Sequence, residues 1–293
     1  DAVRQMLENA GMTLEQCGGI GIGSPGTIDA KQGVILYSNN FGWENVPIVE
    51  ELKKHLDTRI EIANDADAAA LGEVCAGAAE GAENAVLLTL GTGVGSGVIL
   101  DKKIFRGGMP GGCELGHLSI RYDGIRCTCG RKGCLEAYAS ASALLRIARE
   151  KAAEHPESIM NEMCGNDLEQ MNGKIPFDAA KAGDEAGMET VKEYEGYLAC
   201  GIANVINTFR PEKVILGGGV AAQKDNLTAP LKDLVKDMCF GGSHGHIADI
   251  VTSVLGNDAG IIGAADDEPL YNGASSDTKT LILLPGPPRE MKP

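Results

Sequence analysis

The sequence lacks any apolar run long enough to cross a bilayer, and its first residues lack the pattern of a signal peptide. The opening stretch, DAVRQMLENAG, is amphipathic, whereas a signal peptide joins basic residues to an apolar block. The chain also lacks the even, closely spaced cysteines of a secreted disulfide framework, because its 9 cysteines are scattered over apparent core and loop positions. We therefore expect a cytoplasmic protein.

Basic residues are few relative to acidic ones. The chain has 26 Lys and Arg against 41 Asp and Glu, which makes its net charge -15. Such an excess of negative charge repels nucleic acid and anionic membranes, so we expect neither as a partner. The 293 residues are enough for two compact domains with substantial cores.

The chain carries neither of the two familiar nucleotide-binding fingerprints. The run GTGVGSG, from Gly91 to Gly97, follows a predicted buried strand, but no helix follows it and it has no P-loop lysine. Such a turn can present backbone N–H groups and the Thr92 hydroxyl to phosphate oxygens, although glycines also make plain hairpins. The run from Gly217 to Gly219 follows another predicted strand, where it permits either close approach of a ligand or close packing of sheet and helix.

The chain does contain a concentrated set of metal-binding residues. Cys127, Cys129 and Cys134 follow one another in C-x-C-x4-C order, and His117 precedes them. Thiolate sulfur and imidazole nitrogen are ligands that zinc prefers, and four protein ligands make a closed, structural site. The alternatives are three ordinary cysteines, or a disulfide with one thiol left over. A loop this rich in Gly, Arg and Lys offers free thiols no apolar burial, so we expect zinc.

Four polar residues near these motifs are candidates for ligand binding. Glu114 and Glu136 bracket the metal-binding residues, where each is either an ordinary surface acid or a rigidly held group that grips hydroxyls. Asn64 and Asp65 lie between a predicted strand and an Ala-rich helix. That position suits a helix N-cap, and it is also where α/β sheets place their ligands, beyond the carboxyl end of a strand.

Predicted strands and helices alternate along the chain, which indicates an α/β fold. Residues 156–176 are polar and contain Pro and Gly, so we expect a variable surface excursion there. The only tryptophan, Trp43, is either a sugar platform or an anchor for its loop, and we favour the anchor. Helices are expected at 1–10, 48–57, 135–155 with a cap or break at Ser140, and 177–209 with an interruption near Gly183.

The last stretch, residues 266–293, departs from this alternation. Its run TLILLPGPPREM resembles a segment of the CinA-like, molybdopterin-binding-type family. A lone strand cannot make a domain, so we expect an appended tail that is not an independent domain.

Five motifs follow one another along the chain: SPG, NDAD, GTGVGSG, C-x-C-G-x-x-G-C-x-E and GGGV. In these motifs and their order the chain resembles the ROK family of bacterial sugar kinases and repressors, most closely its glucokinases. The resemblance covers roughly residues 1–265. It implies a two-domain actin-like ATPase/sugar kinase fold of the ribonuclease H-like type, with a structural zinc site. Residues 1–88 would be the remainder of a small N-terminal α/β domain, and 89–265 a larger C-terminal α/β domain with a zinc loop at 111–136.

The resemblance also implies a reaction, in which glucose is phosphorylated by ATP at its C6 hydroxyl to glucose 6-phosphate. Asp65 looks like the general base. The implied sugar-binding residues are Gly26, Asn40, Asn64, Asp65, Glu114, His117 and Glu136. The implied nucleotide-binding residues are Gly91, Thr92, Gly93, Gly217, Gly218 and Gly219. His117, Cys127, Cys129 and Cys134 would bind structural Zn²⁺, and Mg²⁺ would accompany ATP.

One departure from the family pattern is that no D-x-G-G-T phosphate turn occurs in the chain. We expect that turn upstream of residue 1, which makes this chain an amino-terminally truncated fragment. Two alternatives remain: a kinase for N-acetylglucosamine, N-acetylmannosamine, allose or fructose, and a sugar-responsive ROK repressor. Family members are commonly dimers or tetramers, and we expect a homodimer.

Overall fold

The computed structural model describes residues 2–38, 40–244, 247–266 and 279–283. The chain divides into two compact units. Unit 1 comprises Asp1–Leu87, Gly97–Cys113 and Val254–Pro293, and unit 2 comprises Leu88–Ser96 and Glu114–Ser253. Both units are discontinuous in sequence. Residues 97–113 and 254–265 group with unit 1, whereas the sequence-based division at 88 and 265 places them in the larger domain.

Unit 1 contains two small sheets of different kinds. One has the order β11-β1-β5 with all strands parallel, and Ile20 and Ile22 of β1 lie beside Ile60 and Ile62 of β5. The other is antiparallel, with the order β2-β3-β4. Their strands are β1 (Cys17–Ser24), β2 (Thr27–Asp29), β3 (Val34–Ser38), β4 (Trp43–Val46), β5 (Ile60–Asn64) and β11 (Lys279–Leu283).

Apolar side chains of the two sheets form one core in unit 1, with Ile20 and Ile35 almost fully buried. Trp43 packs against this core, and its ring centroid lies 4.8 Å from that of Phe41, as expected for an anchor. The strand predicted in the tail is present as β11, which pairs with β1. The remaining helices of this unit are α1 (Ala2–Ala10), α2 (Ile48–Lys53), α3 (Asp65–Ala76) and α10 (Asp258–Asp266), with a 3₁₀ turn η1 at Leu14–Gln16.

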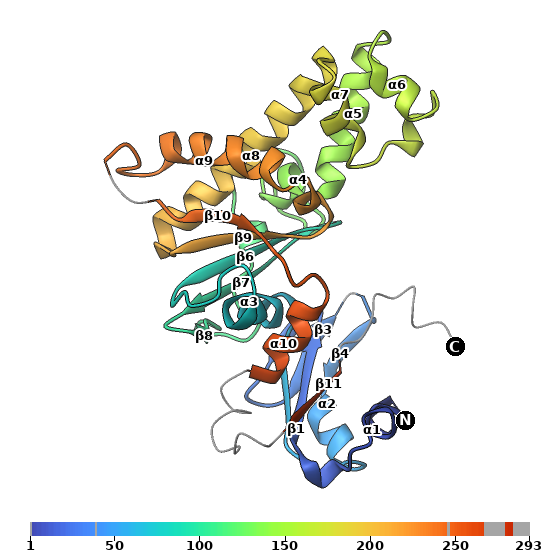
Figure 1. The fold of residues 1–293 in the computed structure, drawn as a ribbon, viewed down its shortest axis with the longest axis vertical. Coiled ribbons are helices and arrows are strands. Elements are labelled where there is room, and N and C mark those ends of the chain that lie inside the picture. Colours follow the sequence, from blue (N-terminus) through green and yellow to red (C-terminus); the bar gives the residue numbers. More distant parts are fainter. Residues whose placement is uncertain (1, 39, 245–246, 267–278, 284–293) are drawn as a thin grey trace. The chain divides into compact units, whose positions relative to one another are not determined.

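Helices α3 and α10 lie side by side in unit 1 (Figure 1). Small residues permit this approach: a Cβ on Gly72 would overlap the backbone of Ala259, and one on Gly263 would overlap that of Ala68. Glu73 of α3 is fully buried, and its carboxylate accepts hydrogen bonds from the N–H groups of Val254 at 3.1 Å and Leu255 at 3.0 Å. The carboxylate therefore ties α3 to the segment that leads into α10.

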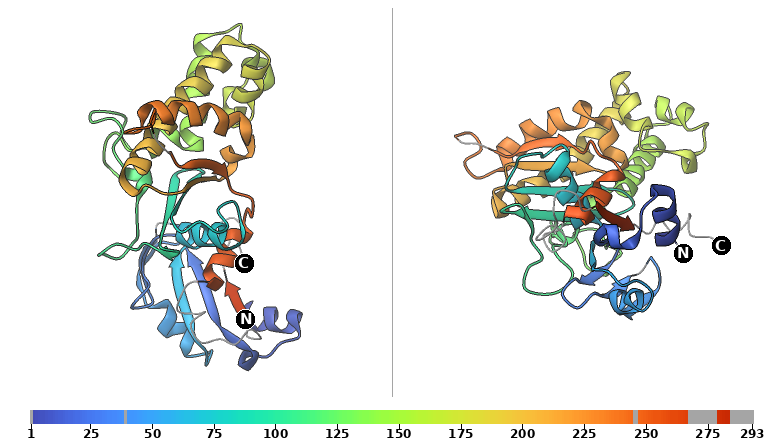
Figure 2. Two further views of the ribbon diagram at one scale, coloured as in Figure 1. Left: turned by 60° about the vertical axis from the view of Figure 1, so that its left-hand side comes forward. Right: turned by 60° about the horizontal axis from the view of Figure 1, so that its bottom comes forward.

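A five-stranded sheet has the order β10-β9-β6-β7-β8. In unit 2, β9 and β10 run parallel, and helices α8 and α9 cover one of their faces (Figures 1 and 2). The strands are β6 (Ala85–Leu90), β7 (Val94–Leu100), β8 (Lys103–Ile104), β9 (Lys213–Gly217) and β10 (Asp249–Thr252). The helices of unit 2 are α4 (Glu136–Ala139), α5 (Ala141–Glu154), α6 (Ile159–Met163), α7 (Ile175–Lys181), α8 (Glu185–Phe209) and α9 (Asp225–Met238), with 3₁₀ turns η2 (Leu115–His117), η3 (Leu168–Gln170) and η4 (Gly219–Gln223).

The expectation of a polar surface excursion at 156–176 was wrong. Met160 and Met171 are buried there, in a core cluster that also contains residues of α5 and α7. Asp184 supports the segment by accepting hydrogen bonds from Ser158 Oγ at 2.8 Å and Ile159 N at 3.1 Å. The helical pieces are single turns, too short to show a 3.6-residue period, so the sequence pattern concealed them.

The break predicted at Ser140 is confirmed, because Ser140 separates α4 from α5 and its hydroxyl accepts a hydrogen bond from Ala143 N. The interruption near Gly183 is also confirmed, since α7 ends at Lys181 and α8 begins at Glu185. Among the described helices, none combines the length and apolar character needed to span a bilayer.

Candidate active site and metal centre

The start of helix α3 in unit 1 carries Asn64 and Asp65. Asn64 is the N-cap, since its Oδ1 accepts hydrogen bonds from Ala66 N at 2.9 Å and Asp67 N at 3.3 Å. Its Nδ2 donates to the carbonyl of Gly26 at 3.1 Å. The strand β5, the helix start and the SPG turn therefore meet at this one side chain.

Because Asn64 makes the cap, the neighbouring Asp65 keeps an accessible side chain at the first position of the helix. Partial loss of hydration raises the pKa of the Asp65 carboxyl above its ordinary value, and a hydrogen bond from Ala66 N opposes that shift. An accessible carboxylate with a raised pKa beyond the end of a strand is suited to accept a proton from a hydroxyl.

Two more predicted residues belong to this unit. Gly26 has φ of +119°, and a Cβ there would overlap the carbonyl of Tyr37, so the turn requires glycine. Asn40 is exposed in the turn between β3 and β4. The structure thus brings Gly26, Asn64 and Asp65 together, and places Asn40 in a separate turn.

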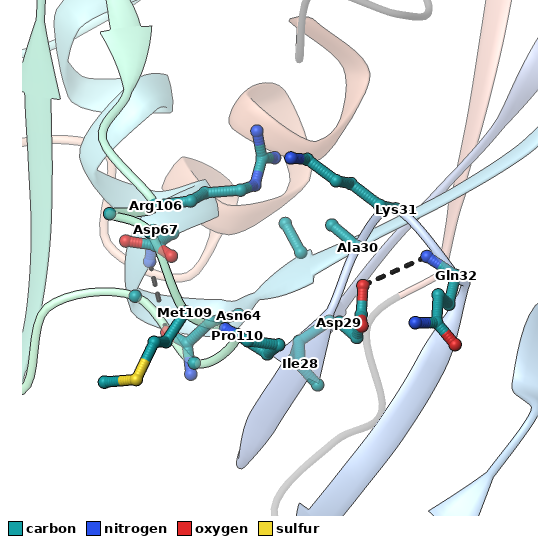
Figure 3. A pocket seen from close by; sticks show the side chains of 15 residues that line it. Ile28, Asp29, Ala30, Lys31, Gln32, Asn64, Asp67, Arg106, Met109 and Pro110 are labelled. Carbon is teal, nitrogen blue, oxygen red and sulfur yellow. Dashed lines mark hydrogen bonds between the residues drawn. The ribbon is translucent and has the colours of Figure 1, made fainter.

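A cavity of about 330 Å³ lies beside this helix start within unit 1 (Figure 3). Asn64, at the end of β5, and the buried Asp67 of α3 line it from one side, and the glycine-rich segment 107–112 lines it from another. The side chains of Lys31 and Arg106 point toward one another at its edge (Figure 3). Sequence reasoning missed Lys31, Asp67 and Arg106; the only available signal was the second Asp of the NDAD run.

The four predicted metal ligands lie together in unit 2. His117 Nδ1 is 3.7 Å from Cys127 Sγ, and Cys129 Sγ is 3.7 Å from Cys134 Sγ. The ligand atoms of the four residues all lie within 4.8 Å of one another. Tetrahedral zinc with bonds of about 2.3 Å to sulfur would hold two sulfurs about 3.8 Å apart, so the donor set fits zinc.

The loop that carries these ligands is shaped by two glycines with positive φ. Gly130 has φ of +89° and Gly133 has φ of +77°. Cys127 N donates to Arg131 O at 2.7 Å, which closes the turn between the first two cysteines and the third. Backbone geometry therefore brings the sulfurs together, as the sequence predicted.

The thiols of this cluster differ in their protonation. Burial raises the pKa of Cys127 to about 12 and also raises that of Cys134. A hydrogen bond from the backbone N–H of Arg131 lowers the pKa of the exposed Cys129. Binding of a cation would displace protons from the two buried thiols.

The Glu136 carboxylate contacts both the cysteine loop and the turn that follows β6. Its Oε1 lies 3.1 Å from Thr128 Oγ1 and 3.3 Å from Cys127 Sγ, and its Oε2 accepts a hydrogen bond from Val94 N at 3.0 Å. Glu114 is exposed and immediately precedes η2. Of the two carboxylates that bracket the metal ligands, only Glu136 has an Oε atom within 3.3 Å of one of them among the contacts of the described residues.

The two glycine-rich turns also meet within unit 2. Residues 91–93 follow β6, and Thr92 is exposed in the middle of the turn. Gly218, at the end of β9, has φ of +81°, and a Cβ there would lie 2.5 Å from the carbonyl oxygen of Leu90. Both turns therefore leave neighbouring strands at the same end, where they can face one ligand.

The comparisons with known proteins agree with this architecture. The sequence matches the ROK family over residues 1–266. It is 40% identical over 247 residues to a glucokinase of Thermotoga maritima, covering 84% of this chain and 77% of that protein. It is also 30% identical over 240 residues to a xylose repressor of Caldicellulosiruptor bescii, covering 82% of this chain and 60% of the repressor.

A solved structure shows the same fold. A ROK family glucokinase from Streptomyces griseus, in complex with glucose and AMPPNP, superposes with a TM-score of 0.75 at 33% sequence identity. The match covers 85% of this chain and 80% of that one.

Proposed function

The chain belongs to the ROK family, and from that premise we propose that it is a glucokinase, which transfers the γ-phosphoryl group of ATP to the C6 hydroxyl of glucose. The observation that carries this proposal within the chain is the start of α3. There Asn64 takes the capping role and leaves Asp65 an accessible carboxylate with a raised pKa. Support from outside the chain comes from the glucokinases among its relatives.

Asp65 is the proposed general base. Its carboxylate would take the proton from the C6 hydroxyl as the hydroxyl oxygen attacks the γ-phosphorus and the bond from that phosphorus to the β,γ-bridging oxygen breaks. Asn64 would orient the base through its place in the helix cap. Gly26, Asn40, Glu114, His117 and Glu136 are the other proposed sugar-binding residues.

Phosphoryl transfer depends chiefly on positioning and charge neutralisation. The Thr92 hydroxyl and the N–H groups of Thr92 and Gly93 would bind phosphate oxygens in a turn closed by the bond from Gly91 N to Gly93 O at 3.0 Å. Gly91 would line this phosphate site, and the glycines at 217–219 would lie against the adenosine. Mg²⁺ would enter with ATP and neutralise phosphate charge. These assignments extend the AMPPNP-binding property named for the Streptomyces griseus relative to this chain.

His117, Cys127, Cys129 and Cys134 would hold a structural Zn²⁺. With four protein ligands the ion has no position open to water, so it would order the loop and take no part in the transfer. Glu136 lies at the end of this loop, with its Oε1 3.3 Å from Cys127 Sγ, so the bound metal would also help to fix this proposed sugar ligand. We also propose a cytoplasmic homodimer that does not bind nucleic acid.

The proposal is tested by measuring ADP formation from ATP and Mg²⁺ with glucose, N-acetylglucosamine, N-acetylmannosamine, allose and fructose. We expect turnover with glucose to exceed turnover with each other sugar. Preference for another hexose would move the assignment to that substrate within the family.

A repressor is the second candidate, since the xylose repressor of Caldicellulosiruptor bescii is also a relative. Sugar binding by calorimetry, without turnover on any sugar in a folded and zinc-loaded sample, would overturn the kinase proposal in its favour.

A further inference from the structure

The turn at Gly91–Val94, called here the phosphate turn, is held at three points by residues 136–142, called the anchor segment. Val94 N donates to Glu136 Oε2 at 3.0 Å, and Ala141 N donates to Gly91 O at 2.8 Å. Ser142 Oγ donates to Thr92 O at 2.9 Å. All three bonds join residues far apart in sequence, and Ser142 lies 50 positions after Thr92.

The close fit of the phosphate turn against the anchor segment is also steric. A Cβ on Gly93 would overlap Glu136 Oε2, so the turn requires glycine where the carboxylate approaches it. The N–H of Val94 and the carbonyls of Gly91 and Thr92 are thereby directed toward the anchor segment. The Thr92 side chain remains exposed on the outer side.

The anchor segment is itself fixed in the core of unit 2. Leu135, just before it, is fully buried, and a Cβ on Gly201 of α8 would overlap the Leu135 side chain. The buried Tyr194 hydroxyl donates to Ala139 O at 2.8 Å. A turn held at three points by a segment that is packed this firmly has few accessible conformations.

We propose that Ser142 is a positioning residue for the phosphates of the nucleotide. Its hydroxyl holds the Thr92 carbonyl at 2.9 Å and so orients the Thr92 hydroxyl and the N–H groups of Thr92 and Gly93 before the nucleotide arrives. Ser142 itself touches neither the nucleotide nor the sugar. The inference rests on the proposed function, in particular on the role of Thr92 and its flanking glycines.

Ser142 lends itself to a clean substitution, because it is exposed at the second position of α5 and its hydroxyl is not the helix cap. Ser142→Ala therefore removes the hydrogen bond without leaving a buried group unpaired. Ser142→Thr keeps a hydroxyl and serves as the rescue variant. Thr208→Ala is the matched control, since it removes an exposed hydroxyl that donates to a backbone carbonyl, that of Asn204 at 2.7 Å, and lies outside both segments.

The experiment measures the affinities of AMPPNP, ADP and adenosine by calorimetry, and the KM values for ATP and glucose, for the wild type and the three variants. Ser142→Ala should weaken AMPPNP and ADP binding about fivefold and raise the KM for ATP by a similar factor. Adenosine affinity and the KM for glucose should be unchanged, and Ser142→Thr should restore most of the phosphate-dependent affinity. Thr208→Ala should leave all of these affinities unchanged.

Equal AMPPNP affinity in Ser142→Ala and the wild type would overturn the inference, and so would an equal loss of adenosine affinity. If the wild type turns over no sugar yet binds AMPPNP, the kinase proposal fails and the same affinities still decide the role of Ser142. If the wild type binds no nucleotide at all, both proposals fail.

Discussion

The proposed site residues of unit 1 and those of unit 2 are held in place by different kinds of interaction. In unit 1, Asn64 and Asp65 occupy the junction of a strand and a helix, and the capping bonds reach only two or three residues along the chain. In unit 2, Glu136 and the phosphate turn are held by side-chain bonds between distant segments and by a loop in which four potential metal ligands converge. The helix cap in unit 1 forms with its helix, and only the bond from Asn64 Nδ2 to Gly26 O is long-range there, whereas the arrangement in unit 2 requires the surrounding tertiary structure.

The two buried glutamates differ in whether their carboxylates are hydrogen-bonded. Glu73 of unit 1 is fully buried, and backbone N–H groups of Ala78, Val254 and Leu255 donate to its carboxylate. Glu195 of unit 2 is also buried, but its Oε1 has no hydrogen-bond partner among the described residues. Accordingly, burial raises the pKa of Glu195 to about 7.

The largest expected effect concerns the base in unit 1. Asp65→Asn should lower kcat about a thousandfold, because the variant cannot accept the proton of the attacking hydroxyl. Thermal stability should be unchanged or slightly higher, since the raised pKa means that ionised Asp65 is disfavoured in the folded protein. Steady-state kinetics and calorimetric melting check both parts.

The raised pKa of Asp65 also sets a pH dependence for the wild type. Its kcat/KM should fall as the pH is lowered through that pKa, because protonation removes the base. Asn64→Ala is the matched comparison. It should cost about 1 kcal/mol of stability through loss of the cap while Asp65 remains. An Asp65→Asn variant with wild-type kcat would show that the carboxylate is not the base.

Removal of the proposed metal tests whether the phosphate turn of unit 2 depends on the metal loop. Chelation, or Cys134→Ser, should destabilise the protein by several kcal/mol and speed hydrogen exchange in 111–136 and, through Glu136, in the phosphate turn. Exchange at 60–76 in unit 1 should stay unchanged. Mass spectrometry of exchange and metal analysis measure these effects.

Cys200→Ala is the control for metal removal, since this cysteine of α8 is outside the cluster and is not fully buried. Its metal content should match that of the wild type. Equal hydrogen exchange at the phosphate turn with and without metal would show that the metal loop does not stabilise this turn.

Glu73→Ala tests whether unit 1 also depends on a distant bond. The substitution leaves the N–H groups of Ala78, Val254 and Leu255 without their acceptor, so it should cost about 3 kcal/mol. Urea denaturation measures the loss, and Glu80→Ala, at an exposed position of the same unit, is the control. A cost below about 0.5 kcal/mol would show that α3 and α10 associate through packing of small residues alone.

The smallest expected effect is that of Glu195→Gln. The folded-state pKa of about 7 exceeds that of an unfolded glutamate, so the folded protein holds an extra proton between about pH 4.5 and 7. Wild-type stability should therefore decrease as the pH rises through this window. Glu195→Gln should be more stable than the wild type at pH 8, and the difference should shrink as the pH is lowered and vanish below about pH 4. Melting curves at the two pH values check the sign, and a difference independent of pH would contradict it.

Several parts of the fold were predictable because their signals are local. The strand–helix junction at Asn64, the break at Ser140 and the convergence of Cys127, Cys129 and Cys134 are encoded within short windows by capping residues, glycines and ligand spacing. The segment 156–176 was missed because its buried Met160 and Met171 show no period that a short window can detect.

Short-range sequence patterns identify the capping residues, the turns and the four residues that could hold a metal, since these properties depend on neighbours a few positions away. Which of the candidate carboxylates reaches the phosphate turn depends on tertiary packing, because Glu136 and Val94 are 42 positions apart. Tertiary packing also joins Glu73 of the Ala-rich helix α3 to Val254, 181 positions further along the chain. Contacts of this range arise when packed elements bring distant backbone groups to a buried side chain, and no local pattern records them.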